Sequence, residues 1–192
     1  MRRGNVFIVS GPSGAGKGTL VKQVLGRVPG VWVSVSVTTR PPRPGEVDGA
    51  HYGFISAEEF DRLIAEDGLL EWAEVHGNRY GTPREAVERH VGTGDQVILE
   101  IDPQGAMQVK QQLPSAVLVF VAAPSMEELR RRLEARGSES ADEVETRLTN
   151  AERELLFAGT YDHVVINDDV PRAADELARI IDSYADDKES DT

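Results

Sequence analysis

The segment "IVSGPSGAGKGTL" (residues 8–20) joins an apolar, β-branched run to the start of a predicted helix through a glycine-rich turn. Gly11, Gly16 and Lys17 fit the pattern G-x-x-x-x-G-K. Glycines in this pattern let the backbone turn tightly, so that its N–H groups point at phosphate oxygens, and the following helix adds its positive N-terminal end. The segment therefore predicts a phosphate-binding loop. The alternative interpretation is an ordinary glycine-rich turn with a solvated lysine.

Thr19 is the expected hydroxyl group for a metal ion at this loop. In the commonest form of the pattern a Ser or Thr directly follows the lysine and faces Mg²⁺, but here Gly18 stands at that position. The hydroxyl falls instead on Thr19, which we expect to reach Mg²⁺ directly or through a water molecule. The loop alone does not distinguish a GTPase, an ATPase motor or a kinase.

Apolar runs around the loop predict the fold class. Between the runs, most of the sequence has helical periodicity. Strands that are apolar on both faces and alternate with helices are typical of a parallel sheet covered on both sides. The sequence therefore predicts the α/β class. The β-branched runs, each bounded by turn residues, are residues 5–10, 31–37, 96–101, 116–122 and 163–167.

The spacing of these runs predicts an insertion and a lid. The gap between the second and third runs is too long for one crossover, and we assign residues 38–92 to an inserted substrate-binding subdomain. A polar stretch between two predicted helices has the composition of a mobile flap, and we assign residues 136–150 to a lid. The acidic end of the chain, 184–192, is expected to be disordered. The core is then formed by residues 1–37, 93–135 and 151–183.

Composition excludes several classes of function. Of the 192 residues none is Cys, so disulfides and thiolate metal sites are excluded, and the four His lack the close spacing of a zinc site. A net charge of −12 argues against nucleic acid as the main partner. The sequence has no apolar run of about 20 residues and no leader segment, so we expect a cytoplasmic protein without a membrane partner.

The segment "SVSVTTRPPRPGEVDGAHY" (residues 34–52) predicts a second anion site. Arg40 and Arg43 are three residues apart in a proline-stiffened loop, which lowers the cost of directing two guanidinium groups at one phosphate. The alternatives are a solvated basic loop and a Pro-x-x-Pro ligand at residues 41–44.

At this point the sequence resembles the guanylate kinase family. The shared motifs occur in the order and spacing of that family and cover nearly the whole chain. The loop motif together with the arginine motif separates guanylate kinases from adenylate and thymidylate kinases. The motifs are "GPSGAGKGT", "SVSVTTRPPRPGEVDGAHY", "LLEWAEVHGNRYGT", "LEIDPQGA", "RRRLEARGSES" and "VVINDD".

The resemblance implies ATP-dependent phosphorylation of GMP, and of dGMP, in purine nucleotide metabolism. It also implies a P-loop nucleoside monophosphate kinase fold: a five-stranded parallel core sheet flanked by helices, with an inserted GMP-binding subdomain and a lid. ATP would be bound by Gly11, Pro12, Ser13, Gly14, Ala15, Gly16, Lys17, Gly18, Thr19 and Asn167. The GMP phosphate would be bound by Arg40, Arg43, Tyr52 and Tyr80. The guanine would be met by Ser36, Glu71, Thr82 and Asp102. The sequence departs from the family pattern at Gly53, where an aromatic residue is usual.

Glu71 supports this resemblance independently. Guanine offers two donors on one edge, N1–H and the 2-amino group, and a carboxylate accepts both, whereas adenine offers an acceptor at N1. Glu71 lies in a strand-like run, where an inward acid would otherwise be anomalous. The alternatives are a solvated strand glutamate at residue 71 and ordinary half-buried aromatic side chains at Tyr52 and Tyr80.

The predicted reaction needs cations rather than a general base. A phosphate monoester has a second pKa of about 6, so the attacking phosphate is already an oxyanion near neutral pH. His51 and His76 are accordingly interpreted as structural or solvated. The reaction needs charge neutralisation and alignment, which Mg²⁺ as cofactor and basic side chains supply. The expected catalytic residues are Lys17, Arg40, Arg132, Arg136 and Arg147.

Helical phase selects the last three of these arginines. Arg132 and Arg136 lie four residues apart beside the apolar stripe of one predicted helix, and Arg131 points away from it. Arg147 lies beside the stripe of the next helix, so all three flank the lid. The alternative is a set of surface pairs such as Glu143 with Arg147. Asp102 follows the third run, where a parallel sheet opens its ligand crevice, and it is expected to meet guanine, the waters of the metal ion, or both.

Two other functions compete with this one. The first is a catalytically inactive guanylate-kinase-like module that binds a phosphorylated peptide. The second is a sugar-phosphate kinase of the same fold. The intact Lys17 argues against the first, and a carboxylate at Glu71 argues against the second. The sequence leaves open whether the protein is a monomer or a homo-oligomer.

Overall fold

Five parallel strands form the core of the protein, as the sequence predicts. The computed structural model describes residues 3–75, 77–135 and 140–185. The core strands pair in the order β2-β7-β1-β8-β9. Each predicted apolar run contributes one of them: β1 (Asn5–Ser10), β2 (Val31–Val33), β7 (Gln96–Glu100), β8 (Val117–Ala122) and β9 (His163–Ile166).

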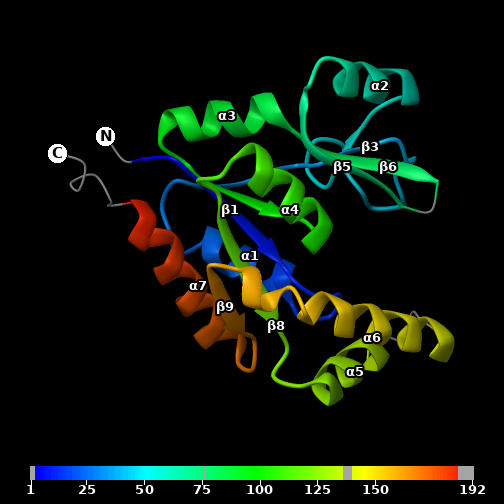
Figure 1. Cartoon of the computed structure of the whole chain (residues 1–192), viewed down its shortest axis with the longest axis vertical. Coiled ribbons are helices and arrows are strands. Elements are labelled where there is room, and N and C mark those ends of the chain that lie inside the picture. The colour runs from blue at the N-terminus through cyan, green and yellow to red at the C-terminus, as the bar shows by residue number, and fades with distance from the viewer. Residues whose placement is uncertain (1–2, 76, 136–139, 186–192) are drawn as a thin grey trace.

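Helices cover both faces of this sheet (Figure 1). Alternate residues of β1 serve the two faces: Phe7 and Val9 pack in one cluster, and Val6 and Ile8 in the other. The first face is covered by α1 (Lys17–Leu25) and α7 (Val170–Ala185), and the second by α3 (Arg84–Thr93) and α4 (Pro103–Gln112). Burial on both faces explains why the runs are continuously apolar.

A second, four-stranded sheet has the order β4-β3-β6-β5. It corrects one expectation, because residues 31–37 do not form a single strand. The chain pairs with β7 through Val33, and the N–H of Ser34 makes one more bond to the core, 2.9 Å from the carbonyl oxygen of Ile98. The chain then leaves the core. The strands of the second sheet are β3 (Val37–Thr38), β4 (Gly53–Phe54), β5 (Leu69–Val75) and β6 (Asn78–Pro83).

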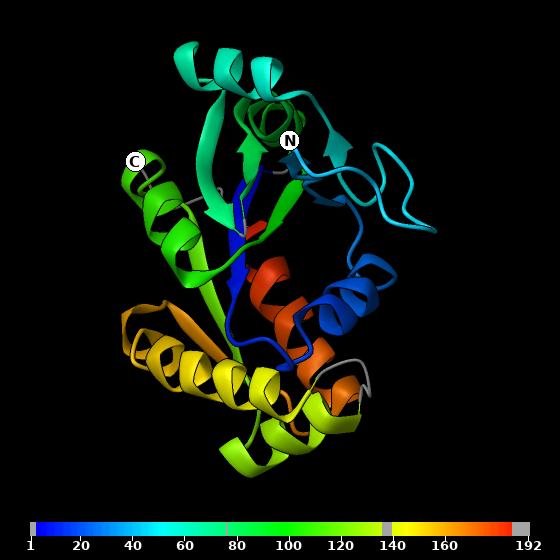
Figure 2. The same cartoon turned by 90° about the vertical axis from the view of Figure 1, so that its right-hand side faces the viewer.

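The second sheet and a helical pair lie at opposite ends of the molecule (Figures 1 and 2). The helix α2 (Ala57–Ala65) lies beside the second sheet. At the other end α5 (Met126–Ala135) packs against α6 (Ala141–Leu155) through Leu129, Leu133, Val144 and Leu148. A short 3-10 helix, η1 (Ala158–Thr160), leads from α6 towards β9. The core sheet therefore stands between two peripheral units that both carry predicted site residues.

Some predicted boundaries fall at places where the structure is continuous. Leu70 of β5 and Val87 of α3, both within the predicted insertion 38–92, are buried in the core cluster that contains Ile8. The sequence placed Tyr184 and Ala185 in a disordered tail, but α7 continues through Ala185. Residues 186–192 and 136–139 lie outside the described part of the chain. No helix within the described ranges is long and apolar enough to cross a membrane.

Candidate active site

The loop after β1 has the form of a phosphate-binding loop. The backbone at Gly11 has φ +134°, and a Cβ atom there would lie 2.1 Å from the carbonyl oxygen of Val121. Gly16 caps α1 in the left-handed conformation, with φ 93°, and the helix begins at Lys17. Only glycine adopts these positions without strain. The loop and the start of α1 line a pocket of about 400 Å³ formed by Pro12, Ser13, Gly14, Gly16, Lys17, Gly18, Thr19, Lys22 and Glu100.

Basic side chains from two sides contact this loop. The Lys17 Nζ atom donates to the carbonyl oxygens of Gly11 and Pro12, the latter at 3.1 Å. Arg147 of α6 donates to Ser13 Oγ at 2.6 Å. Arg132 of α5 donates to the carbonyl oxygen of Ala15 in the loop at 3.5 Å and to that of Asn167 at 2.8 Å. These contacts place two of the predicted lid arginines at the loop, and the third, Arg136, lies outside the described residues.

The predicted helical phase of α5 is confirmed. Arg131 points to solvent, with 75% of its side chain exposed, whereas 23% of the Arg132 side chain is exposed. Both arginines bind Glu128, whose pKa they lower to about 2. Leu129 and Leu133 fill the buried side of the same helix.

Asn167 supports the phosphate-binding loop through its side-chain amide. Its side chain is buried, and its Nδ2 atom donates to the carbonyl oxygen of Ala15 at 2.7 Å. The same Nδ2 atom lies 2.3 Å from the position that a Cβ atom would take at Gly16. Asn167, predicted to bind ATP, therefore also fixes the backbone of the phosphate-binding loop.

Arg40 lies at the centre of a second charged group, on the loop that follows β3. Its guanidinium binds both carboxylate oxygens of Glu46, at 2.9 and 3.0 Å. Glu46 is the main cause that raises the pKa of Arg40, and Tyr80 adds to it. The Tyr52 ring lies 5.5 Å from the Arg40 guanidinium carbon and 5.8 Å from the Tyr80 ring. The structure thus brings together Arg40, Tyr52 and Tyr80, as the sequence predicts, and adds Glu46. Arg43 lies exposed on the same loop.

Glu71 is a buried carboxylate on β5. Its side chain accepts the Thr82 hydroxyl at 2.6 Å, and the residue is only 7% exposed. Burial is the main cause that raises the pKa of Glu71, and the nearby Asp102 carboxylate adds to it. Asp102 caps α4 by accepting the N–H of Gly105 at 2.8 Å. The N-terminus of α4, where the second sheet adjoins the core sheet, therefore brings together Glu71, Thr82 and Asp102.

Ser36 and Glu100 connect these groups. Ser36 lines a pocket of about 430 Å³ together with Tyr52 and His51. Glu100, at the end of β7, lines both this pocket and the pocket of the phosphate-binding loop. Burial raises the pKa of the Glu100 carboxyl, and Lys17 and Lys22 oppose that shift. Of the residues predicted to bind the GMP phosphate, Tyr52 therefore lines a pocket that meets the pocket of the phosphate-binding loop at Glu100.

Comparison with known proteins decides the family. The guanylate kinase family model matches residues 3–184. The chain belongs to the guanylate kinase family. Guanylate kinases of Desulfitobacterium hafniense (strain Y51) and Rubrobacter xylanophilus are 54% and 53% identical to it, over 93% and 94% of this chain and 89% and 95% of theirs. The crystal structure of guanylate kinase from Anaplasma phagocytophilum is 36% identical, with a TM-score of 0.78 over 98% of this chain and 90% of that one. The chain is accordingly an enzyme of the kinase class with the P-loop nucleoside monophosphate kinase fold.

One departure of this guanylate kinase from the family motif has a local explanation. A Cβ atom at Gly53 would lie 3.2 Å from Val37 Cγ1, and the Gly53 N–H donates to the carbonyl oxygen of Ser36 at 2.9 Å. The strands β3 and β4 therefore approach closely at the glycine. His51 accepts the N–H of Val47 at 3.1 Å, a contact within the same loop, and His76 lies outside the described residues.

Sequence reasoning missed two acids of this kinase. Glu46 lies within the arginine motif, and an acid six residues after an arginine in a turn-rich loop can form an ion pair with it. Glu154 follows Arg147 by seven residues, a spacing that puts both on one face of α6. Glu154 and Arg147 line a further pocket beside Ser13. Burial is the main cause that raises the pKa of Glu154. The seven-residue spacing from Arg147 is the sequence signal that identifies Glu154.

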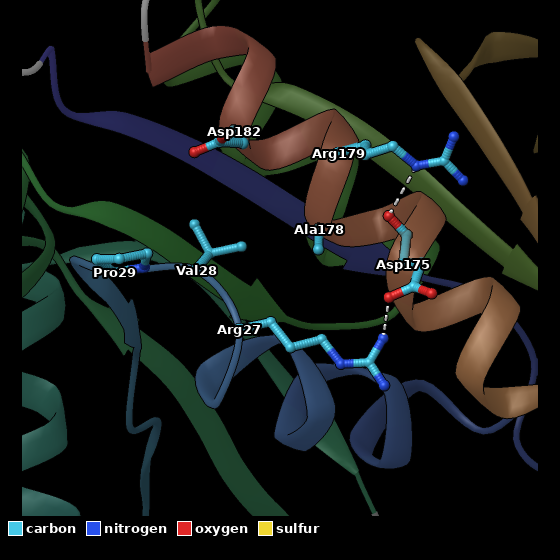
Figure 3. Close-up of a pocket in the computed structure, with 7 residues that line it drawn as sticks. All are labelled: Arg27, Val28, Pro29, Asp175, Ala178, Arg179 and Asp182. Carbon is cyan, nitrogen blue, oxygen red and sulfur yellow. Dashed lines mark hydrogen bonds and ion pairs between the residues drawn. The ribbon is translucent and has the colours of Figure 1, made fainter.

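A pocket between α7 and the turn that follows α1 shares no residue with these groups (Figure 3). Its Arg27 guanidinium donates to Asp175, and to the carbonyl oxygen of Pro171 at 3.2 Å. Protein groups already bind the principal cation of this pocket, so we assign it no part in the reaction. It is lined by Arg27, Val28, Pro29, Asp175, Ala178, Arg179 and Asp182.

Proposed function

We propose that this kinase transfers the γ-phosphoryl group of ATP to GMP, and to dGMP, across the boundary between the phosphate-binding loop and the second sheet. ATP:GMP phosphotransfer is the activity of the family to which the chain belongs. The observation that carries the choice of acceptor is the buried Glu71 carboxylate. A carboxylate that is only 7% exposed is costly unless a ligand or the fold uses it.

Guanine is the ligand that suits this carboxylate. Thr82 occupies one Glu71 oxygen, at 2.6 Å, and the carboxylate retains lone pairs for the N1–H and 2-amino donors of guanine. Asp102 and Ser36 complete the proposed guanine site. An adenine ring would direct its N1 lone pair at the carboxylate, so the same group excludes AMP.

The GMP phosphate then falls to Arg40, Arg43, Tyr52 and Tyr80. These residues lie on the loop after β3 and on β6, which are joined through the pairing of Thr38 with Tyr80. Two guanidinium groups and two phenol hydroxyls supply donors for a dianion. Pairing of β3 with β6 holds the arginine loop and Tyr80 in a fixed relation.

The ATP phosphates are proposed to lie in the phosphate-binding loop, bound by its backbone N–H groups and by Lys17. Arg132 and Arg147 would move from their present contacts with loop oxygens to the phosphate oxygens. Thr19, which is exposed in the same pocket as Glu100, offers a hydroxyl beside a carboxylate, and oxygen donors of this kind fit Mg²⁺. Magnesium supplies charge neutralisation on the ATP phosphates when it is bound.

The residues of this chain account for the chemistry without a general base. The acceptor phosphate is an oxyanion, so the protein must align the two nucleotides and offset the repulsion between them. Positive charge is supplied from two sides of the site. Lys17, Arg132 and Arg147 lie at the phosphate-binding loop, and Arg40 and Arg43 lie on the loop after β3. Closure of a lid at residues 136–150 remains a prediction; it would exclude water from the transferred group.

A nucleotide panel tests the proposed function. The intact chain is assayed with ATP and Mg²⁺ against GMP, dGMP, IMP, AMP and ribose 5-phosphate, and each diphosphate product is quantified, with EDTA as the metal control. We expect GMP and dGMP to be the best acceptors, IMP weaker and AMP very poor. Preferential turnover of the ribose phosphate would instead establish a sugar-phosphate kinase. Binding of GMP without any turnover would establish the inactive phosphopeptide-binding type.

A further inference from the structure

Glu46 has no role in the proposed function, yet it makes the most extensive charged contacts of the arginine loop. Its carboxylate binds Arg40 Nη2 at 2.9 Å and Nη1 at 3.0 Å, and it also accepts the N–H of Arg43 at 2.7 Å. One carboxylate therefore contacts both residues that the proposed function assigns to the GMP phosphate. The Arg40 and Glu46 side chains are only 10% and 19% exposed.

The loop holds this carboxylate independently of Arg40. The N–H of Glu46 donates to the carbonyl oxygen of Arg43 at 3.0 Å, while the Glu46 side chain accepts the N–H of Arg43. Gly45, with φ +87°, permits the tight turn between them. Displacing the carboxylate from Arg40 would therefore require the turn itself to rearrange. Glu46 is a fixed part of the loop.

A donor count shows which edge of Arg40 remains for a ligand. A guanidinium has five N–H donors arranged in two forks, one at the Nη1/Nη2 end and one at the Nε/Nη2 side. Glu46 occupies the end fork, and the carbonyl oxygen of Pro41 accepts from Nη1 at 2.8 Å. Arg40 Nε is buried and has no partner among the described residues. The Nε side is thus the edge of Arg40 that Glu46 and Pro41 leave for a ligand.

We propose that Glu46 is a positioning residue for the GMP phosphate: by holding the end fork of Arg40 and the backbone of Arg43, it presents the Nε side of Arg40 to the phosphate. This inference rests on the proposed function. The Tyr52 and Phe54 rings, 5.5 and 5.8 Å from the guanidinium carbon, limit its rotation further. Glu46 also neutralises a poorly hydrated cation while no nucleotide is bound. Since Arg40 and Arg43 hold the pKa of Glu46 near 2, it remains ionised throughout the range in which the enzyme is assayed.

The opposite role would be that of a competitor. A carboxylate that merely occupies Arg40 until the phosphate displaces it would weaken GMP binding, and its removal would strengthen it. A positioning carboxylate predicts the reverse sign. The sign of the change in GMP affinity therefore separates the two roles.

The test compares Glu46→Gln with Glu85→Gln, a matched change at an exposed position on α3. For Glu46→Gln we expect KM for GMP to rise about ten- to a hundred-fold, because bonds between charged groups are lost and an amide N–H₂ faces the guanidinium. We expect KM for ATP to stay within about two-fold, since the loop of Lys17 is untouched, and kcat to change less than KM for GMP, since Glu46 acts on the bound phosphate only through Arg40 and Arg43. Glu46→Asp, which keeps the charge, should recover part of the loss. An unchanged or lower KM for GMP in Glu46→Gln overturns the proposal.

Direct binding separates this proposal from the proposed function. GMP and guanosine are titrated calorimetrically into the parent, Glu46→Gln and Glu46→Asp proteins, with melting temperatures as a check on folding. We expect the variants to lose affinity for GMP and to bind guanosine as the parent does. Equal losses for both ligands would mean that Glu46 serves the fold of the second sheet and overturn the positioning role. A parent that binds no GMP would contradict the proposed function instead.

Discussion

The two halves of the proposed site are built from different parts of the chain. The donor half is a backbone structure: Gly11 and Gly16 shape it, and the cations beside it, Lys17 and Arg147, contact carbonyl and hydroxyl oxygens. The acceptor half is made of side chains, with Arg40 paired to Glu46 and a buried carboxylate at Glu71. Backbone N–H groups suit any phosphate chain, whereas side chains can select one base. We infer that changes in the donor half alter turnover, and changes in the acceptor half alter the choice of substrate.

Lys17→Met should have the largest effect and should be confined to the donor half. We expect kcat to fall about a hundred- to a thousand-fold, the usual cost of removing one donor from developing charge. The affinity for GMP should stay close to that of the parent, because Lys17 lies at the phosphate-binding loop, where its Nζ atom donates to the carbonyl oxygens of Gly11 and Pro12. Steady-state kinetics and GMP calorimetry measure both quantities. Comparable turnover in the variant would remove the loop lysine from the mechanism.

Glu71→Gln should act on substrate choice. The amide turns one acceptor into a donor that faces a guanine donor, so kcat/KM for GMP should fall roughly ten- to several-hundred-fold. IMP, which lacks the 2-amino group, should lose less, and AMP should change least. Glu74→Gln, on the same strand but exposed, is the control. Equal losses for all three nucleotides would make Glu71 structural and direct attention to Asp102 or Ser36.

The raised pKa of Glu71 predicts a pH dependence in the acceptor half. Burial favours the protonated form, so the Glu71 carboxyl takes up its proton at a higher pH than an ordinary glutamate. A protonated carboxyl cannot accept both guanine donors. We therefore expect KM for GMP to rise as the pH falls, by about ten-fold per unit below that pKa at most. The Glu71→Gln protein retains the titration of the GMP phosphate but should lack this additional rise.

The smallest expected effect is on stability. A carboxyl whose folded pKa is raised contributes stability below its unfolded pKa and loses it as the pH rises through the folded pKa. The ionised Glu71 therefore costs free energy of folding at neutral pH. Glu71→Gln should be more stable than the parent at pH 7 to 8 by on the order of 1 kcal/mol, and the gain should vanish near pH 4. Urea unfolding across this range, with Glu74→Gln as control, measures it. A gain independent of pH would not come from the buried charge.

Much of the fold was predictable because its signals are local. The strand runs are apolar on both faces, and the glycines of the phosphate-binding loop stand at fixed spacings, so β1, α1 and the core sheet follow from the sequence. The run 31–37 was misjudged because alternating valines and serines fit a strand in either sheet. The strand β2 ends at Val33 because its pairing with β7 stops there.

The site was predictable where one residue type carries the chemistry. Arg40, Tyr52 and Tyr80 lie together and Thr82 contacts Glu71, while their roles toward GMP stay predictions. Glu46 and the supporting contact of Asn167 were not foreseen, because they depend on which groups the folded loops bring within hydrogen-bonding distance. A sequence shows that Asn167 is polar, but not that its amide meets the carbonyl oxygen of Ala15.

The shared core cluster limits how this enzyme can acquire new acceptors in evolution. Leu70 of the second sheet and Val87 of α3 are buried together with Ile8 and Leu118 of the core sheet. Exchanging the whole insertion for another domain would therefore open the interior and expose apolar surface. A lineage that keeps this core can change its substrate only by replacing single side chains on a retained scaffold. Recombination at the predicted boundaries 38 and 92 should accordingly yield insoluble chimaeras, whereas libraries of point substitutions around Glu71 should stay folded.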